Sequence, residues 1–153
     1  MRRLAFAGLL LVSGCDPLYG VHRTAPLAAA PELICVERAI AQTDGVASVV
    51  YHARHEGKGL IHPTPWIYDF VWTGAPGSGI SGSLQLIKTY DGHISYSNSR
   101  WQIGRPPPQS SIDATRPVMR AMERTVAARC GITELTEAVR EDCPGVSCNP
   151  LPN

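Results

Sequence analysis

The first fifteen residues constrain this chain more than any other stretch, because they decide the compartment in which it folds. Arg2 and Arg3 give a short basic start, Leu4 to Val12 is an apolar run, and small residues lead from it to Cys15. This order is typical of a secretory signal peptide. The run is too short to cross a bilayer as a helix, which takes about 20 residues. We therefore expect export and cleavage, with residues 1–14 removed.

The residues that end the apolar run resemble a known processing site. Val12-Ser13-Gly14-Cys15 is similar to the lipobox of bacterial lipoproteins, in which an aliphatic residue and two small residues precede a cysteine. In that class the cysteine thiol receives a diacylglyceryl group, a dedicated signal peptidase cuts in front of it, and the new amino group is often acylated. The resemblance covers these residues only. It implies a mature chain that begins at Cys15 and carries lipid there.

Such a lipid would decide where the protein resides. One acyl chain gives marginal membrane binding, with an association constant of about 10⁴ M⁻¹, whereas two or more chains hold a protein stably. The resemblance therefore implies a protein anchored to a membrane of the bacterial cell envelope by lipid on Cys15, on the periplasmic side. Asp16 resembles the signal that retains lipoproteins of enteric bacteria at the inner membrane, which favours the inner over the outer membrane. The alternative is an ordinary secretory signal that happens to meet a cysteine.

The mature chain has the size of one ordinary domain and a nearly balanced charge. About 140 residues remain after cleavage, which is enough to bury a core. The whole chain has 14 basic and 13 acidic side chains, and Arg2 and Arg3 leave with the signal. A charge near zero without a basic cluster gives no electrostatic basis for binding nucleic acid. We therefore expect one domain and no nucleic-acid partner.

The two ends of the mature chain differ from its middle. Residues 15–30 are rich in Ala and Pro without apolar periodicity, so we expect a lipid-anchored tether there. Residues 149–153 are expected to form a disordered tail. The folded domain is therefore predicted to span residues 31–148.

Four cysteines remain when Cys15 is assigned to the lipid, and an exported, oxidising compartment favours their pairing. Cys143 and Cys148 flank Pro-Gly-Val-Ser, a turn-forming sequence that brings their sulfurs together. Cys35 and Cys130 are then the natural second pair. A zinc site is the weaker alternative, because Cys-x4-Cys has no partner pair at zinc-like spacing.

Two main helices are predicted, one near each end of the domain. Pro31 suits the first turn of the first helix, in which apolar residues recur at helical spacing. The second is expected to begin at Asp113 or Thr115 and to end at Cys130, with Pro117 confined to its first turn. A short third helix is expected before the last cysteines. A disulfide between Cys35 and Cys130 would join the two main helices.

Strand patterns fill the middle of the chain. The Asp91-Gly92 dipeptide is the strongest hairpin signal, because both central residues of a type I′ turn need positive φ. It predicts that Leu84 pairs with Ser99. The stretches with strand character are Val46–His55, Trp66–Thr73, Ile80–Tyr90 and His93–Ile103. The sequence therefore predicts an α+β fold, in which an antiparallel meander of about four strands is flanked by two helices joined by a disulfide.

An aromatic row marks the second of these strands. Trp66, Tyr68, Phe70 and Trp72 alternate with other residues and therefore share one face. Such a row could stack against a glycan or another ligand, or it could be the core face of a central strand. The domain has few other bulky residues to fill a core, which favours burial.

Few residues suggest chemistry. His52, His55 and His62 could supply imidazole ligands to copper or zinc, but positions three apart on a strand point to opposite faces, and solvated histidines are the simpler interpretation. Residues 77–82 match G-x-G-x-x-G, yet a strand rather than a helix follows, so we expect no dinucleotide cofactor. No serine lies in a G-x-S-x-G nucleophile elbow.

These observations favour a binding or structural module over an enzyme. No acid–base pair or nucleophile constellation stands out, so we expect no catalytic activity and no cofactor. The expected partner is an envelope protein or the cell wall, with the membrane reached through the lipid. A periplasmic metal-binding protein that uses His52, His55 and His62 is the alternative.

Overall fold

A computed structural model describes residues 17–57, 64–89 and 91–148. The signal peptide, Cys15, His62 and the predicted tail at 149–153 lie outside this part of the chain, as do the side chains of His55 and Trp66. The elements in chain order are β1 (Leu18–Leu27), α1 (Leu33–Ala41), β2 (Ser48–Gly57), β3 (Thr64–Thr73), β4 (Ser81–Lys88), β5 (Ile94–Ile103), α2 (Gln109–Cys130), α3 (Glu134–Glu137) and β6 (Arg140–Asp142).

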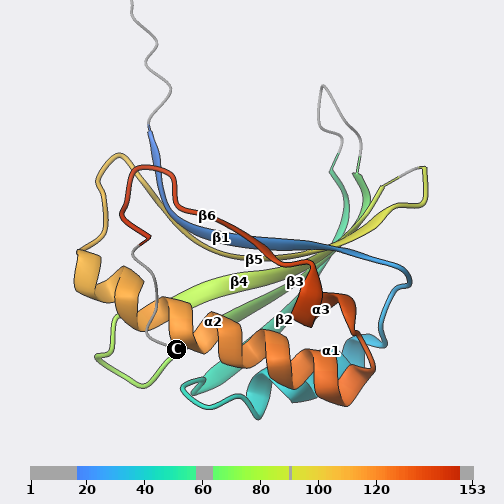
Figure 1. The fold of residues 1–153 in the computed structure, drawn as a ribbon. Coiled ribbons are helices and arrows are strands. Elements are labelled where there is room, and N and C mark those ends of the chain that lie inside the picture. The colour runs from blue at the N-terminus through green and yellow to red at the C-terminus, as the bar shows by residue number, and fades with distance from the viewer. Residues whose placement is uncertain (1–16, 58–63, 90, 149–153) are drawn as a thin grey trace, which may run out of the picture.

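The strands form one antiparallel sheet in the order β2-β3-β4-β5-β1-β6, and the helices lie against one of its faces (Figure 1). The predicted α+β class and the β2-β3-β4-β5 meander are confirmed. The expected number of four strands is wrong, because β1 and β6 extend the sheet beyond β5. We call the face that carries the helices the inner face and the opposite face the outer face.

Strand β1 replaces most of the expected tether. Leu18–Leu27 pairs with β5 along its whole length, from Leu18 opposite Ile103 to Leu27 opposite Ile94. Every second residue from Val21 onward is buried on the inner face, but one of these positions holds an arginine, which interrupts the apolar alternation. The tether prediction therefore fails from Leu18 onward, and the folded domain begins earlier than residue 31.

The hairpin between β4 and β5 forms at the predicted place with a different register. Leu84 pairs with Asn98 rather than with Ser99. The N–H of Gly92 donates to the Thr89 carbonyl at 3.0 Å, and the N–H of Thr89 donates to the His93 carbonyl at 2.9 Å. Three residues therefore lie between Thr89 and His93, and Gly92 supplies the positive φ that such a loop requires, in place of the two-residue turn expected.

Helix α2 starts earlier than the sequence pattern suggests. It begins at Gln109, so Pro117 lies inside the helix and not in its first turn. At this position Pro117 provides no N–H for the carbonyl four residues before it, which is a local cost that the packing of the helix must offset. The helix ends as expected, at Gly131 with φ of 68°. Helix α3 is the short third helix.

The core lies between the inner face and the two main helices. Phe70 and Trp72 of the aromatic row are fully buried there, which confirms the core interpretation for these two residues. Both predicted disulfides are present. Cys35–Cys130 joins α1 to α2, and Cys143–Cys148 closes the loop that follows β6.

Candidate functional site

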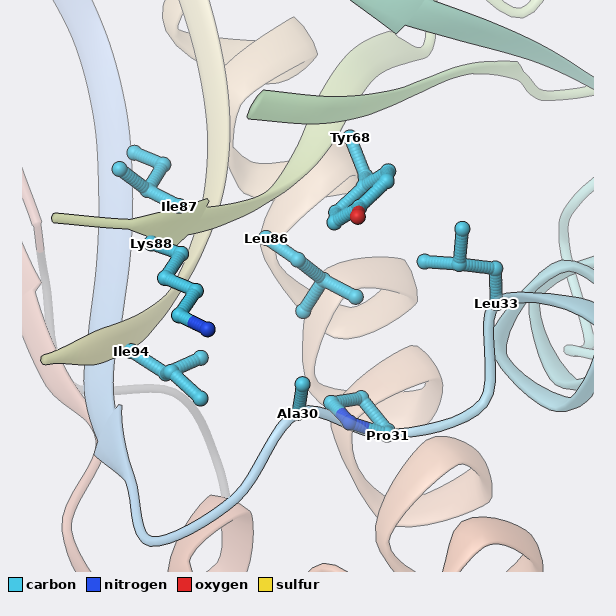
Figure 2. A pocket seen from close by; sticks show the side chains of 8 residues that line it. All are labelled: Ala30, Pro31, Leu33, Tyr68, Leu86, Ile87, Lys88 and Ile94. Carbon is cyan, nitrogen blue, oxygen red and sulfur yellow. The ribbon is translucent and has the colours of Figure 1, made fainter. Parts of the chain in front are cut away.

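A small pocket opens at the end of the sheet where the chain passes from β1 to α1 (Figure 2). Its volume is about 130 Å³. This is less than the roughly 300–1,000 Å³ of sites that enclose a drug-sized ligand. The pocket is therefore large enough for one side chain or a similar small group. Its lining residues are Ala30, Pro31, Leu33, Tyr68, Leu86, Ile87, Lys88 and Ile94.

The pocket combines apolar walls with two polar groups. Leu33, Leu86 and Ile94 provide aliphatic surface, while the Tyr68 hydroxyl and the Lys88 ammonium are the polar groups that reach it (Figure 2). Lys88 is the last residue of β4, and its exposed side chain turns back toward Leu86. An ammonium group beside an apolar cavity can pair with a carboxylate whose neighbouring carbon chain fills that cavity.

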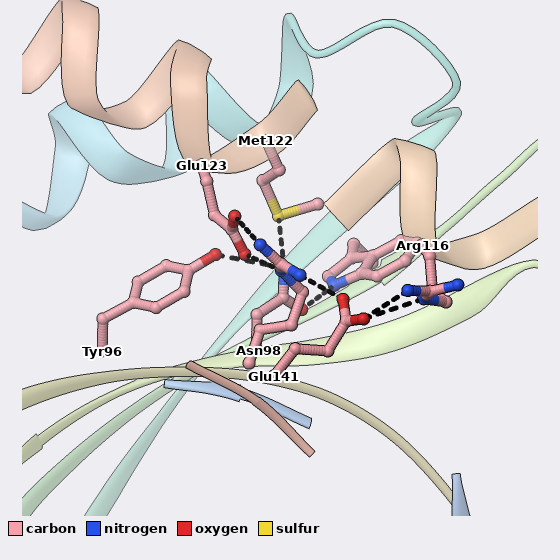
Figure 3. Close-up of polar contacts among 8 residues, drawn as sticks. Tyr96, Asn98, Arg116, Met122, Glu123 and Glu141 are labelled. Carbon is pink, nitrogen blue, oxygen red and sulfur yellow. Dashed lines mark hydrogen bonds and ion pairs between the residues drawn. The ribbon is translucent and has the colours of Figure 1, made fainter. Parts of the chain in front are cut away.

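A chain of buried ion pairs ties the edge of the sheet to helix α2 (Figure 3). Arg23 of β1 donates two hydrogen bonds to Glu123 of α2, from Nε to Oε1 at 2.6 Å and from Nη2 to Oε2 at 2.9 Å. Arg23 also pairs with Glu141 of β6. Glu141 in turn accepts from Arg116 of α2, at 3.1 Å from Nε. Two arginines and two carboxylates thus connect three elements.

Burial explains why these charges are paired. Arg23 is 7% exposed and Glu123 is 4% exposed, so neither charge could remain unpaired without a large desolvation cost. Burial raises the pKa of Glu123, and the hydrogen bonds and charge of Arg23 oppose that shift. Burial also raises the pKa of Glu141, but hydrogen bonds from Arg116 and the charge of Arg23 lower this pKa below the usual carboxyl value. We interpret this network as structural.

A second polar group lies within the core itself. Asn98 of β5 is fully buried, and its Oδ1 accepts the indole N–H of Trp72 at 3.1 Å. Its Nδ2 donates to the Tyr96 hydroxyl at 3.2 Å and to the Met122 sulfur at 3.4 Å. Burial holds the pKa of Tyr96 well above its usual value, so this phenol stays protonated. These contacts orient the core side chains (Figure 3).

The outer face carries a histidine, a serine and an aspartate close together. His22 Nε2 lies 2.9 Å from Ser97 Oγ, and His22 pairs across the sheet with Asp142 of β6. Burial lowers the pKa of His22, although the charge of Asp142 acts in the opposite direction. The backbone around Ser97 pairs with β1 on one side and β4 on the other. Its N–H groups are therefore engaged in the sheet and are not directed at a developing oxyanion, as acyl transfer would require.

Of the three predicted metal ligands, the structure describes only the side chain of His52. His52 is exposed on the outer face, and β2 runs without a break from Ser48 to Gly57. Backbone alternation therefore places positions 52 and 55 on opposite faces of the sheet. His62 and the side chain of His55 lie outside the described residues.

A carboxylate and two cysteine sulfurs lie as close together as metal ligands do. The ligand atoms of Glu141, Cys143 and Cys148 all lie within 4.8 Å of one another. Both sulfurs form the Cys143–Cys148 disulfide, and the carboxylate is held by two arginines. In this state the disulfide occupies both sulfurs and the arginines occupy the carboxylate, so the three groups offer no ligand to a metal.

Neither the pocket nor the ion-pair network is predicted by the sequence pattern. Glu123 follows Met119 by four residues on the apolar face of α2, and this polar residue at a core position was the available signal for a buried partner. Tyr68 appeared only as a member of the aromatic row. The pocket residues come from four separate segments, so no local pattern marks them.

No match was found to any protein-family model, to any curated protein or to any solved structure. Among the helices of residues 17–57, 64–89 and 91–148, none is long and apolar enough to cross a membrane.

Proposed function

We propose that this protein is a lipid-anchored module of the bacterial envelope that binds a peptide segment of another envelope protein. Lipid on Cys15 would hold it to the periplasmic side of a membrane, with the inner membrane favoured by Asp16. The observation that carries the binding role is the pocket formed by Tyr68, Leu86 and Lys88 with the chain between β1 and α1. The role is non-catalytic, because the pocket provides recognition groups and no nucleophile–base pair.

The position of the pocket supports this role. Strand β1 starts three residues after Cys15 and is 10 residues long, which corresponds to about 33 Å. Cys15 precedes the start of this strand in the sequence, and Ala30 and Pro31 of the pocket follow its end. A partner could therefore reach the pocket while the other end of the domain stays near the membrane.

The chemistry of the pocket indicates what the partner segment presents. A single aliphatic side chain fills a cavity of this size, and the Lys88 ammonium favours a carboxylate directly beside it. A segment with an apolar residue next to Asp or Glu, or an apolar C-terminal residue, has both groups. We choose a protein segment over a glycan chain because the pocket has mostly aliphatic walls rather than an array of hydroxyl-binding groups.

Photocrosslinking in intact cells tests this function. A photoreactive amino acid at Ala29, next to the pocket, should crosslink a protein through a segment of the chemistry described. Ala30→Trp should fill the mouth of the pocket and abolish this crosslink, and Lys88→Glu should weaken it by charge repulsion. Ala114→Trp is the matched control, because Ala114 is an exposed alanine on α2. This variant should crosslink like the wild type.

Two results would contradict the proposal. A crosslink that survives Ala30→Trp unchanged would show that the pocket is not the binding site. A crosslink to peptidoglycan in place of a protein would show that the choice of partner is wrong.

A further inference from the structure

Three large apolar side chains are exposed together at the start of β1. Leu18 is 44% exposed, Ile103 is 67% exposed and Trp101 is 37% exposed. Leu18 and Ile103 are direct partners across β1 and β5, and Trp101 precedes Ile103 by two residues, so all three lie on the outer face. We call these residues the apolar tip. Exposed apolar residues gathered at one place indicate an interaction surface more strongly than scattered ones do.

The ring of Trp101 is held in a defined position. It lies across Gly20, its cross-strand partner, where an added Cβ would come within 3.1 Å of the ring and would collide with the Arg100 carbonyl. The ring also contacts that of His22, with centroids 5.2 Å apart. The indole therefore has a fixed orientation while part of its surface remains exposed.

The apolar tip is also close to the lipid attachment residue along the chain. The N–H of Gly104 donates to the Pro17 carbonyl at 3.0 Å, so the chain is fixed to the domain at Pro17. Cys15 precedes Pro17 by two residues and can extend only about 7 Å from it. A lipid on Cys15 would therefore bring the bilayer surface next to Leu18 and Ile103.

We propose that the apolar tip lies in the interfacial layer of the bilayer that receives the lipid of Cys15. This inference rests on the lipid anchor of the proposed function and adds a second, side-chain contact with the same membrane. Tryptophan is enriched at membrane interfaces, because its ring is apolar and its N–H can remain hydrated. Aliphatic side chains beside it gain from contact with the acyl boundary, and the exposed Arg105 is placed to meet anionic headgroups.

The contact fixes how the domain stands on the membrane. The lipid alone would hold the domain at one point, whereas lipid and apolar tip together define two points of attachment. The strands then run from the apolar tip away from the surface, and the pocket at the other end of β1 points into the periplasm. A second copy of the chain is a less suitable occupant, because the short link to the lipid keeps the apolar tip against the bilayer.

Tryptophan quenching in vesicles tests this contact. The acylated protein, purified from membranes, is reconstituted into vesicles of phosphatidylethanolamine and phosphatidylglycerol that contain a phospholipid brominated near the top of its acyl chains. Bromine should quench part of the wild-type fluorescence, and Trp101→Phe should remove most of that quenching. Ile103→Ser should reduce the quenching of Trp101. Val50→Ser changes an aliphatic residue of β2 that is 52% exposed, and it should have no effect.

The two proposals fail in different ways. Equal quenching in wild type and Trp101→Phe, with mass spectrometry showing acylated Cys15, would overturn the membrane contact and leave the anchor intact. A mature protein without acyl groups on Cys15 would overturn the lipid anchor, and the membrane contact with it. Unchanged crosslinking through the pocket in the Trp101→Phe variant would show that the two surfaces act separately.

Discussion

Arg23 occupies a core-facing position of β1 because two carboxylates from distant parts of the chain neutralise it. Its partner Glu123 is 100 residues away and Glu141 is 118 residues away. Because this arginine interrupts the buried row of Val21, Ala25 and Leu27, the stretch shows no apolar periodicity in the sequence, and no local pattern shows that the charge is paired. Asn98 is a similar case, because a one-residue change of hairpin register moves it from the outer face to the core.

Removing Arg23 should destabilise the domain by about 3–5 kcal/mol, because Arg23→Met leaves the buried Glu123 carboxylate without its main partner. The double variant Arg23→Met/Glu123→Leu removes both charges and should recover more than half of that loss. Urea unfolding of the three proteins measures both effects. A cost below about 1 kcal/mol for the single variant would show that water or Arg120 compensates the carboxylate.

The lowered pKa of Glu141 predicts a loss of stability in acid. A carboxyl whose folded pKa is below its unfolded value, about 4.3, contributes stability above that value and loses it as the pH falls through the folded pKa. The thermal midpoint should therefore fall more steeply below about pH 4.3 in the wild type than in Glu141→Gln. The raised pKa of Glu123 acts in the opposite direction, and the Glu141 charge contributes to that rise, so the difference between the two proteins reports Glu141 together with its effect on Glu123. Parallel curves for the two proteins would contradict this account.

At the scale of elements, the meander and the two main helices follow from local pattern, whereas β1 and β6 do not. Strand β6 consists of Arg140, Glu141 and Asp142, which have no strand preference. It pairs with β1 at the edge of the sheet, where Glu141 contacts two buried arginines. A short, charged edge also limits pairing with other chains. Whether β1 and β6 join the sheet depends on contacts between residues far apart in the chain, which no local sequence pattern reveals.

The two disulfides should differ in what they contribute. Cys35–Cys130 links α1 to α2 across 95 residues, and closing such a loop is worth up to about 4.7 kcal/mol on the chain-entropy model. Cys143–Cys148 spans 5 residues, for which the same relation gives about 2 kcal/mol. Replacing each pair by alanine should therefore cost more stability for the long link, as measured by denaturant unfolding. The reverse order would mean that the short loop is needed for the adjacent Glu141 contacts.

At the scale of the whole molecule, the apolar tip and the pocket lie at opposite ends of the sheet. One end of β1 carries the apolar tip and follows Cys15, the proposed lipid attachment residue, by three residues, and the other end borders the pocket. The helices cover the inner face and are locked by the ion pairs and the long disulfide, so the strands can act as a rigid spacer. With the proposed lipid anchor, the distance from membrane to pocket would be set by strand length rather than by a flexible tether.

A longer link between lipid and domain should therefore change the molecule's orientation without changing its fold. Inserting ten Gly/Ser residues between Asp16 and Pro17 adds a flexible segment with a root-mean-square span of about 17 Å. The Gly104–Pro17 hydrogen bond and the sheet remain, so the thermal midpoint should stay that of the wild type. Quenching of Trp101 by brominated lipid should fall, because the lipid no longer holds the apolar tip at the interface, while acylation of Cys15 persists. If quenching is unchanged, the affinity of Leu18, Trp101 and Ile103 for the bilayer suffices by itself, and the short link only delivers them to it.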